Sequence, residues 1–395
     1  MNYTQKCFLS IISDFLRKLD SSHLAYGKEM DWNTLYGLAH SHNVEGIIYY
    51  QCKSFMPINI VKLYEEFFIG TLFLYTNRKN ILKEVTDAFH KDNIPFCLIK
   101  GYSIAEFYPI AELRTMGDCD ILVDKTHISK AISVMRSLGY QGIDNERASS
   151  WEGEKDGYIF EIHDNLVHTN EHLTSEQIRF FNDITPYITK TRLEYNFSFL
   201  FLLVHLRKHF MNSGVGIRQF MDLAVMVQYC SAMNWDWIEN KLIELDLLKF
   251  AQSCFILIHR WFNILPPIDC GTMENEFYEK VTDKILRNGV FGNNDISNTG
   301  NFERNVLIKS EGNLLVRRLS LIIHNMFPNY EYMQGYPSCG YIVGRPYLIP
   351  VAWIHRFILY TCRDNKGTIR RVFNGALTDS KKLEDQKSFL EKMGL

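Results

Sequence analysis

Residues 116–123 read MGDCDILV, and this short stretch decides how the fold is interpreted. Its Ile-Leu-Val run predicts a buried strand, yet Asp118 and Asp120 place two carboxylates on that strand. Side chains alternate between the two faces of a strand, so both carboxylates share one face. The other face then carries Cys119, Ile121 and Val123. Two carboxylates this close raise each other's pKa unless a cation lies between them, so the stretch predicts a cation site on a sheet.

The segments around this strand predict a small α/β unit. PFCLIK, residues 95–100, is a short strand, and YIFEIHD, residues 158–164, alternates like another. Between them, residues 126–139 form a predicted helix that Thr126 can cap and Gly139 can end. Helical spacing dominates outside this unit, in residues 4–19, 32–51, 59–91 and from about 173 to 266.

The order of these segments predicts an α+β fold, with a small mixed β-sheet core flanked by N-terminal and C-terminal helical regions. We expect an N-terminal helical region, an α/β core, a helical domain packing over the cleft and a mixed, basic C-terminal region, at residues 1–92, 93–170, 171–286 and 287–395. Residues 287–301 are rich in Gly and Asn and predict a loop or linker.

The composition is that of an ordinary soluble protein. Of 395 residues, 46% are hydrophobic and 22% are charged, and the net charge of −2 argues against a nucleic-acid coat protein. Nine cysteines without a C-x-x-C pair favour reduced thiols. The apolar run in residues 197–206 is shorter than the ~20 residues of a membrane-spanning helix. We expect no signal peptide, no membrane contact and a cytoplasmic location.

A third carboxylate is available on the strand YIFEIHD, where Glu161 and His163 share one face. Glu161 can join the two aspartates in a metal site, or it can face solvent or pair with an arginine. His163 can line the same site or pack against the helical region. Mg²⁺ suits such a set, because it prefers oxygen ligands and is usually held by one or two carboxylates plus substrate phosphates.

The turn after the strand PFCLIK offers a place for a phosphate. Gly101 lets a phosphate approach the backbone at a strand-to-helix turn, and Ser103 adds a hydroxyl. Lys100 and Arg114 can supply positive charge to a triphosphate. Alternatively, Lys100 is solvated at its strand end, and Arg114 pairs with an acid to hold its own loop.

Two pairs farther along the chain are also candidates. His205 and His209 lie four residues apart on a predicted helix, a spacing that can bind zinc, but no third ligand accompanies them. We therefore favour hydrogen-bonded histidines that line the cleft or lie in a helical interface. Arg218 and Asp222 can form an ion pair one helical turn apart.

The C-terminal region is basic. Residues 301–371 contain ten Lys and Arg against four acids, and we favour a solvated face over a surface for RNA or a phosphorylated sugar.

The stretch LIKGYSIAEFYPIAELRTMGDCDILV, followed by FEIHDNL, resembles the uncharacterised nucleotidyltransferase family of bacterial proteins, within the DNA polymerase β-like superfamily. Residues 202–227 and, more loosely, 340–357 resemble its helical part. The resemblance implies that Gly101 and Ser103 bind nucleotide phosphates and that Asp118 and Asp120 hold two metals. It also implies that Glu161 is a metal ligand or a base, and alternatively places the segment of Arg218 over the nucleotide.

The sequence and the resemblance together predict a metal-dependent nucleotidyltransferase. With Mg²⁺ or Mn²⁺, it would transfer an NMP from an NTP to a hydroxyl acceptor and release pyrophosphate. The acceptor stays open among a small molecule, a sugar, tRNA and a protein. Two rival hypotheses are a toxin-like enzyme that modifies tRNA or protein, and a nucleotide-binding or scaffolding module without turnover.

Overall fold

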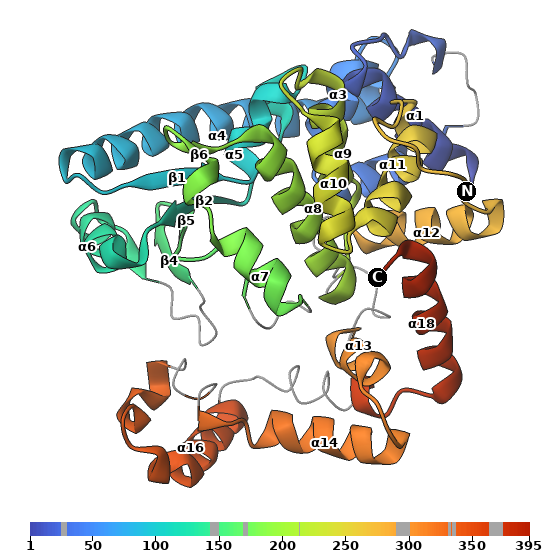
Figure 1. Cartoon of the computed structure of the whole chain (residues 1–395). Coiled ribbons are helices and arrows are strands. Elements are labelled where there is room, and N and C mark those ends of the chain that lie inside the picture. The colour runs from blue at the N-terminus through green and yellow to red at the C-terminus, as the bar shows by residue number, and fades with distance from the viewer. Residues whose placement is uncertain are drawn as a thin grey trace.

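The computed structural model describes most of the chain. The described residues are 1–24, 30–142, 150–168, 173–212, 214–289, 301–330, 333, 337–362 and 374–395. Figure 1 shows a helical body on one side of a small sheet, and the last helices of the chain arranged below them.

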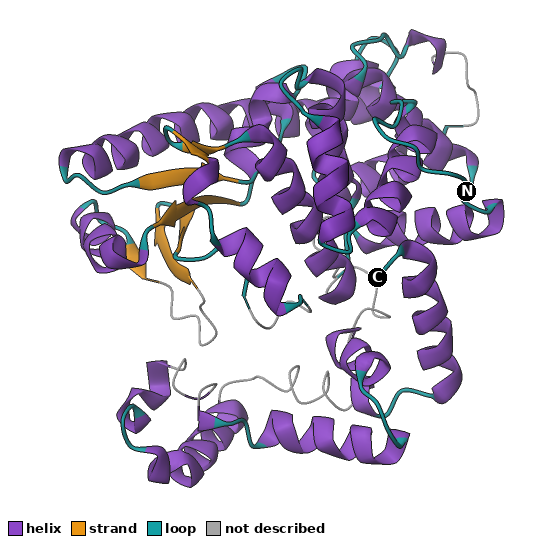
Figure 2. Ribbon diagram, viewed as in Figure 1, coloured by secondary structure: helices purple, strands orange, loops and turns teal. Residues whose placement is uncertain are grey.

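The strands of the described residues form one mixed sheet in the order β3-β4-β5-β2-β1-β7-β6 (Figure 2). Their bounds are Phe96–Ile99 for β1, Asp118–Val123 for β2, Gln141–Gly142 for β3, Ser150–Lys155 for β4, Tyr158–His163 for β5, Ile188–Thr189 for β6 and Arg192–Leu193 for β7. Strand β2 is antiparallel to β1 and parallel to β5. This sheet and the flanking helices confirm the predicted α+β fold.

Strand β4 is absent from the sequence prediction, although its turn carries a clear signal. Asp156 and Gly157 connect β4 to β5 with φ angles of 53° and 79°. Positive φ at both central residues is the geometry that an Asp-Gly hairpin turn provides. Strands β6 and β7 are too short to show alternation, and they extend the sheet to residues beyond 170.

The N-terminal helices are α1 (Tyr3–Leu16), α2 (Trp32–His42), α3 (Glu45–Cys52) and α4 (Ile58–Lys91). The sequence predicts one helix over 32–51, but Asn43 adopts a left-handed conformation with φ 54° and separates two helices. Asparagine tolerates this conformation better than most residues, which explains the break.

Helix α4 has 34 residues and is roughly 51 Å long at the usual rise per residue. Its first turns contribute Ile60 and Tyr64 to the large core of the helical body. Its last turns contribute Val85 and Phe89 to a second core on one face of the sheet. This helix therefore ties the helical body to the sheet.

Helix α6 (Ile128–Ser137) completes the second core with Ala131, Val134 and Met135. The prediction that Thr126 caps it is wrong. The Asp124 side chain instead accepts from the Thr126 backbone N–H in a short 3₁₀ turn before α6. Gly139, with φ 92°, follows the end of the helix as predicted.

The helices of the middle of the chain cover the other face of the sheet and form most of the helical body. They are α5 (Gly101–Ile104), α7 (Ser175–Asn182), α8 (Tyr195–Asn212), α9 (Ile217–Tyr229), α10 (Trp235–Glu244), α11 (Leu248–Phe262) and α12 (Asn275–Asn288). Helix α8 is buried along most of its length, and Phe, Leu and Val occupy half of its positions. No helix in the described part of the chain is long and apolar enough to cross a membrane.

The C-terminal helices are α13 (Asn301–Lys309), α14 (Leu314–Met326), α16 (Ile349–Cys362) and α18 (Ser380–Met393). Helix α18 returns to the body, where Phe389 packs on Phe210 and Phe277. The predicted linker, residues 287–301, lies mostly outside the described residues. Of the basic residues in 301–371, Arg317 and Arg318 donate to backbone carbonyls, and those at 363, 366, 370 and 371 lie outside the described residues.

Candidate active site

The pairing of β2 with β5 brings the predicted carboxylates together. Asp120 lies opposite Glu161, and Asp118 lies opposite Ile159, in a parallel register. Because the side chains alternate, Asp118, Asp120 and Glu161 share one face of the sheet. The opposite face of the same strands carries Ile121, Phe160 and Ile162 in the second core.

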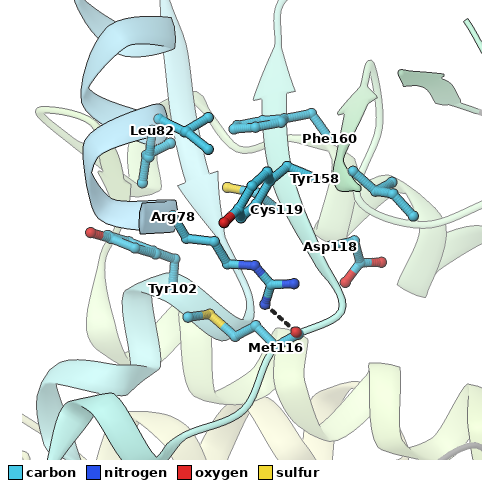
Figure 3. A pocket seen from close by; sticks show the side chains of 10 residues that line it. Arg78, Leu82, Tyr102, Met116, Asp118, Cys119, Tyr158 and Phe160 are labelled. Atoms are coloured by element: carbon cyan, nitrogen blue, oxygen red, sulfur yellow. Dashed lines mark hydrogen bonds between the residues drawn. The ribbon is translucent and has the colours of Figure 1, made fainter. Parts of the chain in front are cut away.

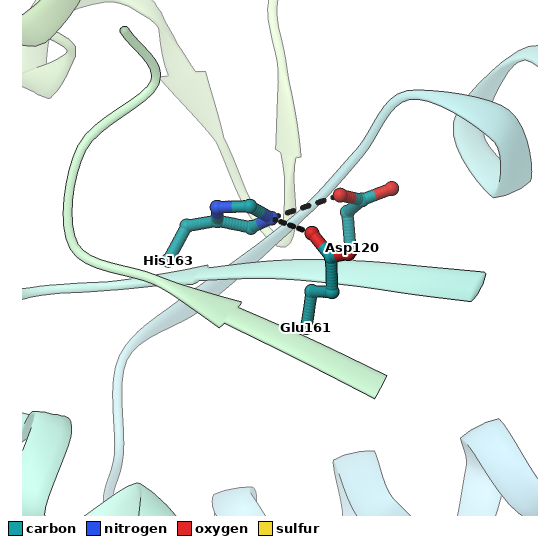
Figure 4. A group of neighbouring side chains, drawn as sticks. All are labelled: Asp120, Glu161 and His163. Carbon is teal, nitrogen blue, oxygen red and sulfur yellow. Dashed lines mark hydrogen bonds and ion pairs between the residues drawn. The ribbon is translucent and has the colours of Figure 1, made fainter. Parts of the chain in front are cut away.

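Asp120 is the centre of a compact charged cluster. Its Oδ1 lies 2.5 Å from Nζ of Lys100 and 2.8 Å from Nε2 of His163. The same Nε2 lies 3.2 Å from Oε2 of Glu161, as Figure 4 shows. We call Lys100, Asp120, Glu161 and His163 the Asp120 cluster.

The charges of this cluster depend on one another. Burial acts to raise the pKa of Asp120, but Lys100 and His163 outweigh it and hold the pKa at about 2. The hydrogen bond from His163 lowers the pKa of Glu161. Burial opposes protonation of His163, yet its bonds to Asp120 and Glu161 raise its pKa above the usual value.

Asp118 behaves differently from Asp120. Its side chain reaches solvent at the start of β2. Burial on its protein side, together with the negative charges of Asp120 and Glu161, raises its pKa to about 6. Asp118 is thus the carboxylate of the site whose charge is least compensated.

Three residues of the described chain are placed to hold a cation together. The ligand atoms of Asp120, Glu161 and His163 all lie within 4.8 Å of one another. The sequence predicts Asp118, Asp120 and Glu161 for this role, whereas His163 takes the place of Asp118 in this group. Two carboxylates and an imidazole suit Mn²⁺, and a contribution from Asp118 on the same face would suit Mg²⁺.

Lys100 is directed into the site, which contradicts the alternative that it is a solvated strand end. Its side chain is 19% exposed and forms the ion pair with Asp120. Its backbone has φ 56° and ψ −130°, an unusual conformation for a residue with a Cβ. The turn from β1 to α5 imposes this conformation and brings the ammonium group beside β2.

The turn that follows Lys100 contains the two predicted phosphate-binding residues. The Ser103 hydroxyl donates to the carbonyl of Lys100 at 2.8 Å, so it holds the turn together. Gly101 lies against Arg114: a Cβ at this position would lie 2.4 Å from its Nη1. A side chain at this position would have to displace the guanidinium group, which Asp222 holds in place.

Arg114 is held away from the cation position. Its Nε and Nη2 donate to the two oxygens of Asp222 at 3.1 and 2.7 Å, and the hydroxyl of Tyr108 donates to the same carboxylate at 2.7 Å. The predicted pair of Arg218 with Asp222 is replaced by this fork. Arg218 instead donates to the carbonyl and hydroxyl of Thr115 at 3.0 and 3.1 Å.

His205 and His209 lie together on α8, with their Nε2 atoms 3.0 Å apart. Burial lowers the pKa of both imidazoles, to about 4 for His209 and well below the usual value for His205. The positive charge of Lys100 also lowers both pKa values, so the pair is within electrostatic reach of the site. No third His, Cys, Asp or Glu of the described residues groups with them.

Arg78 is a residue that the sequence prediction missed. It comes from α4, and its guanidinium donates to the carbonyls of Met116 and Gly117, the residues just before β2. Figure 3 shows it in a small pocket beside Asp118, with Tyr102 and Tyr158 in the lining. The polar run NRKN, residues 77–80, interrupts an apolar helix and is the signal that could have identified it.

Comparison with known proteins agrees with this geometry. Residues 28–263, more than half of the chain, match the model of a protein family described as uncharacterised nucleotidyltransferase. The matched range contains every candidate residue of the site. No curated protein and no solved structure matches the chain.

Proposed function

The chain belongs to the uncharacterised nucleotidyltransferase family, and we propose that it transfers an NMP from an NTP to a hydroxyl acceptor in a reaction that needs Mg²⁺ or Mn²⁺. The single observation that supports this most is the register of β2 and β5. It places Asp118, Asp120 and Glu161 on one face of two adjacent parallel strands. Carboxylates in this arrangement repel one another, which is unfavourable unless cations bind between them and a phosphate.

The metal fits the donor set of the site. Asp118, Asp120 and Glu161 would hold it, with His163 beside them. A bound divalent ion would neutralise the triphosphate and the charge that develops on its oxygens. Burial and the neighbouring carboxylates raise the pKa of Asp118, so a bound cation would favour its charged form.

The chain's own groups would carry the remaining steps. Gly101 and Ser103 would bind the triphosphate at the turn after β1, and Lys100 would supply positive charge beside it. The acceptor oxygen attacks the α-phosphorus, and the bond from that phosphorus to the oxygen bridging to the β-phosphate breaks. Pyrophosphate leaves, and Glu161, whose side chain is 25% exposed, would accept the proton of the acceptor hydroxyl.

Arg114 and Arg218 would act indirectly in this scheme. Arg114 holds the loop before β2 through Asp222, and Arg218 holds the same loop through Thr115. His205 and His209 are buried and neutral, and they would form part of the acceptor side of the site. Arg114 and Arg218 are therefore proposed as positioning residues.

The test is transfer of label from α-³²P-NTPs in the presence of Mg²⁺ or Mn²⁺. Candidate acceptors are the protein itself, total tRNA, and a panel of sugars and small alcohols. We expect Asp118→Asn and Asp120→Asn each to reduce transfer about 10³-fold, the scale of losing a main electrostatic stabiliser. Asp124→Asn is the matched control, because Asp124 is an exposed residue just after β2.

The outcomes separate the rival hypotheses. Label on tRNA or on the protein alone would favour the toxin-like enzyme. Metal-dependent NTP binding without any labelled product would favour the binding module. If neither metal nor NTP binds, the proposed function is wrong.

A further inference from the structure

The two lone pairs of one carboxylate oxygen are already in use at the centre of the site. Oδ1 of Asp120 accepts from Lys100 at 2.5 Å and from His163 at 2.8 Å. A carboxylate oxygen offers about two acceptor directions, so these two donors fill them. A divalent ion can ligate this oxygen only if one of the donors leaves.

Lys100 is the donor better able to leave. His163 is also held by Glu161, at 3.2 Å, and it is fixed on a strand. Lys100 has a flexible four-carbon stem, and among the described residues its ammonium group has one hydrogen-bonding partner, Asp120. Lys100 lies between the end of β1 and Gly101, so its stem starts at the proposed phosphate-binding turn.

Lys100 also lies next to a place where its ammonium group could bind another anion. Residues 101–103, the proposed phosphate-binding turn, follow it directly in the chain. An ammonium that leaves Asp120 would need another anion, because burial makes an unpaired charge costly. The triphosphate of an NTP bound at this turn provides that anion.

We propose that Lys100 is an exchangeable internal cation, which occupies Oδ1 of Asp120, the oxygen that faces His163, until an NTP draws it away. This inference rests on the proposed function and adds a rule for the order of binding. The divalent ion binds weakly to the protein alone, because it competes with Lys100. It binds tightly together with the nucleotide, because the triphosphate takes over the ammonium group. The two ligands therefore bind cooperatively.

The experiment measures Mn²⁺ binding by electron paramagnetic resonance, without nucleotide and with a nonhydrolysable α,β-methylene NTP. In the natural protein, we expect the analogue to tighten Mn²⁺ binding at least tenfold, within the usual range of coupling between sites. In Lys100→Met, Mn²⁺ should bind about tenfold more tightly without nucleotide, and the analogue should add little. Lys100→Arg keeps the charge and should resemble the natural protein.

Lys83→Met is the matched control, because Lys83 also pairs with an aspartate, Asp87, but on the exposed surface of α4. It should leave both affinities unchanged. The inference is wrong if Lys100→Met binds Mn²⁺ no more tightly than the natural protein. If Lys100→Met does not fold, the natural protein decides: equal Mn²⁺ affinity with and without the analogue overturns the inference. Absence of Mn²⁺ binding in every variant would overturn the proposed function as well, which distinguishes the two failures.

Discussion

Two clusters of charge adjoin Gly101, and they differ in how well their charges are balanced. The Asp120 cluster and Asp118 combine three carboxylates with Lys100 and His163. The second, which we call the Asp222 brace, consists of Tyr108, Arg114 and Asp222. In the brace, the Arg114 guanidinium balances the charge of the Asp222 carboxylate, and the Tyr108 hydroxyl donates a further hydrogen bond to it.

The difference separates a structural ion pair from a candidate reactive site. The brace is satisfied within the protein, since Arg114 forms a two-point fork with Asp222 and both are less than a tenth exposed. The pKa of Arg114 is raised by Asp222 despite its burial. The carboxylates around Asp120 outnumber the cations beside them, and burial together with this excess of negative charge raises the pKa of Asp118 to about 6. Excess charge of this kind is typical of sites that bind a charged ligand.

Removing the acid of the brace should have the largest effect on stability. Asp222→Ala leaves the Arg114 guanidinium buried without its counter-charge, and we expect a loss of about 3–5 kcal/mol in the free energy of unfolding. Urea denaturation followed by circular dichroism measures this loss. The double variant Arg114→Met with Asp222→Leu should be less destabilised than Asp222→Ala. A loss below about 1 kcal/mol, the net value of a single hydrogen bond, would show that the brace is not structural.

Filling the space between the two clusters should have an intermediate effect. Gly101→Ala places a methyl group 2.4 Å from Nη1 of Arg114, which the fork to Asp222 holds in place. We expect a loss of about 1–3 kcal/mol, the usual cost of overpacking. Gly117→Ala is the matched control, because nothing lies within 4 Å of the added methyl group. Its thermal midpoint should match that of the natural protein, and equal losses in both variants would refute the close contact.

The smallest effect concerns the pH dependence of the metal-free protein. The folded-state pKa of Asp118 is about 6, above the usual value of 3.8, so the folded protein binds more protons than the unfolded chain between these two values. The contribution of Asp118 therefore favours folding at low pH and is lost as the pH rises from about 4 to about 6. Solvent screening of this exposed group keeps the effect small.

The comparison with Asp118→Asn isolates this effect. The difference in unfolding free energy between the variant and the natural protein should grow in favour of the variant as the pH rises through this window. A difference that does not change with pH would show that Asp118 has an ordinary pKa. Arg114 of the brace does not titrate near neutral pH, because Asp222 raises the pKa of its guanidinium despite burial.

Much of the site could be predicted from the sequence because strand alternation is local. The shared face of Asp118 and Asp120, and that of Glu161 and His163, follows from spacing of two residues within each strand. The long helix over 59–91 follows equally from its periodicity. The family resemblance joined these segments, and the register of β2 and β5 places Asp120 beside Glu161, as the candidate site requires.

The remaining contacts could not be predicted because they join residues far apart in the chain. The fork of Arg114 to Asp222 spans 108 residues, whereas the sequence offered Arg218 as a partner one helical turn away. Lys100 reaches Asp120 only because of its backbone conformation, which no residue pattern signals. Arg78 approaches the loop before β2 because α4 crosses the sheet, and this crossing depends on the packing of the second core.

The parallel pairing of β2 with β5 determines where the chain can accept insertions and deletions. The segment between these strands, residues 124–157, connects them but does not set their register, which the backbone ladder and the buried side chains fix. Insertions in that segment that spare α6 and β4 leave Asp120 opposite Glu161, whereas deletion of a single residue within β2 or β5 turns the carboxylates to the wrong face. A reporter domain is therefore best inserted within residues 124–157 but outside α6 and β4, because α6 packs in the second core and β4 pairs with β5.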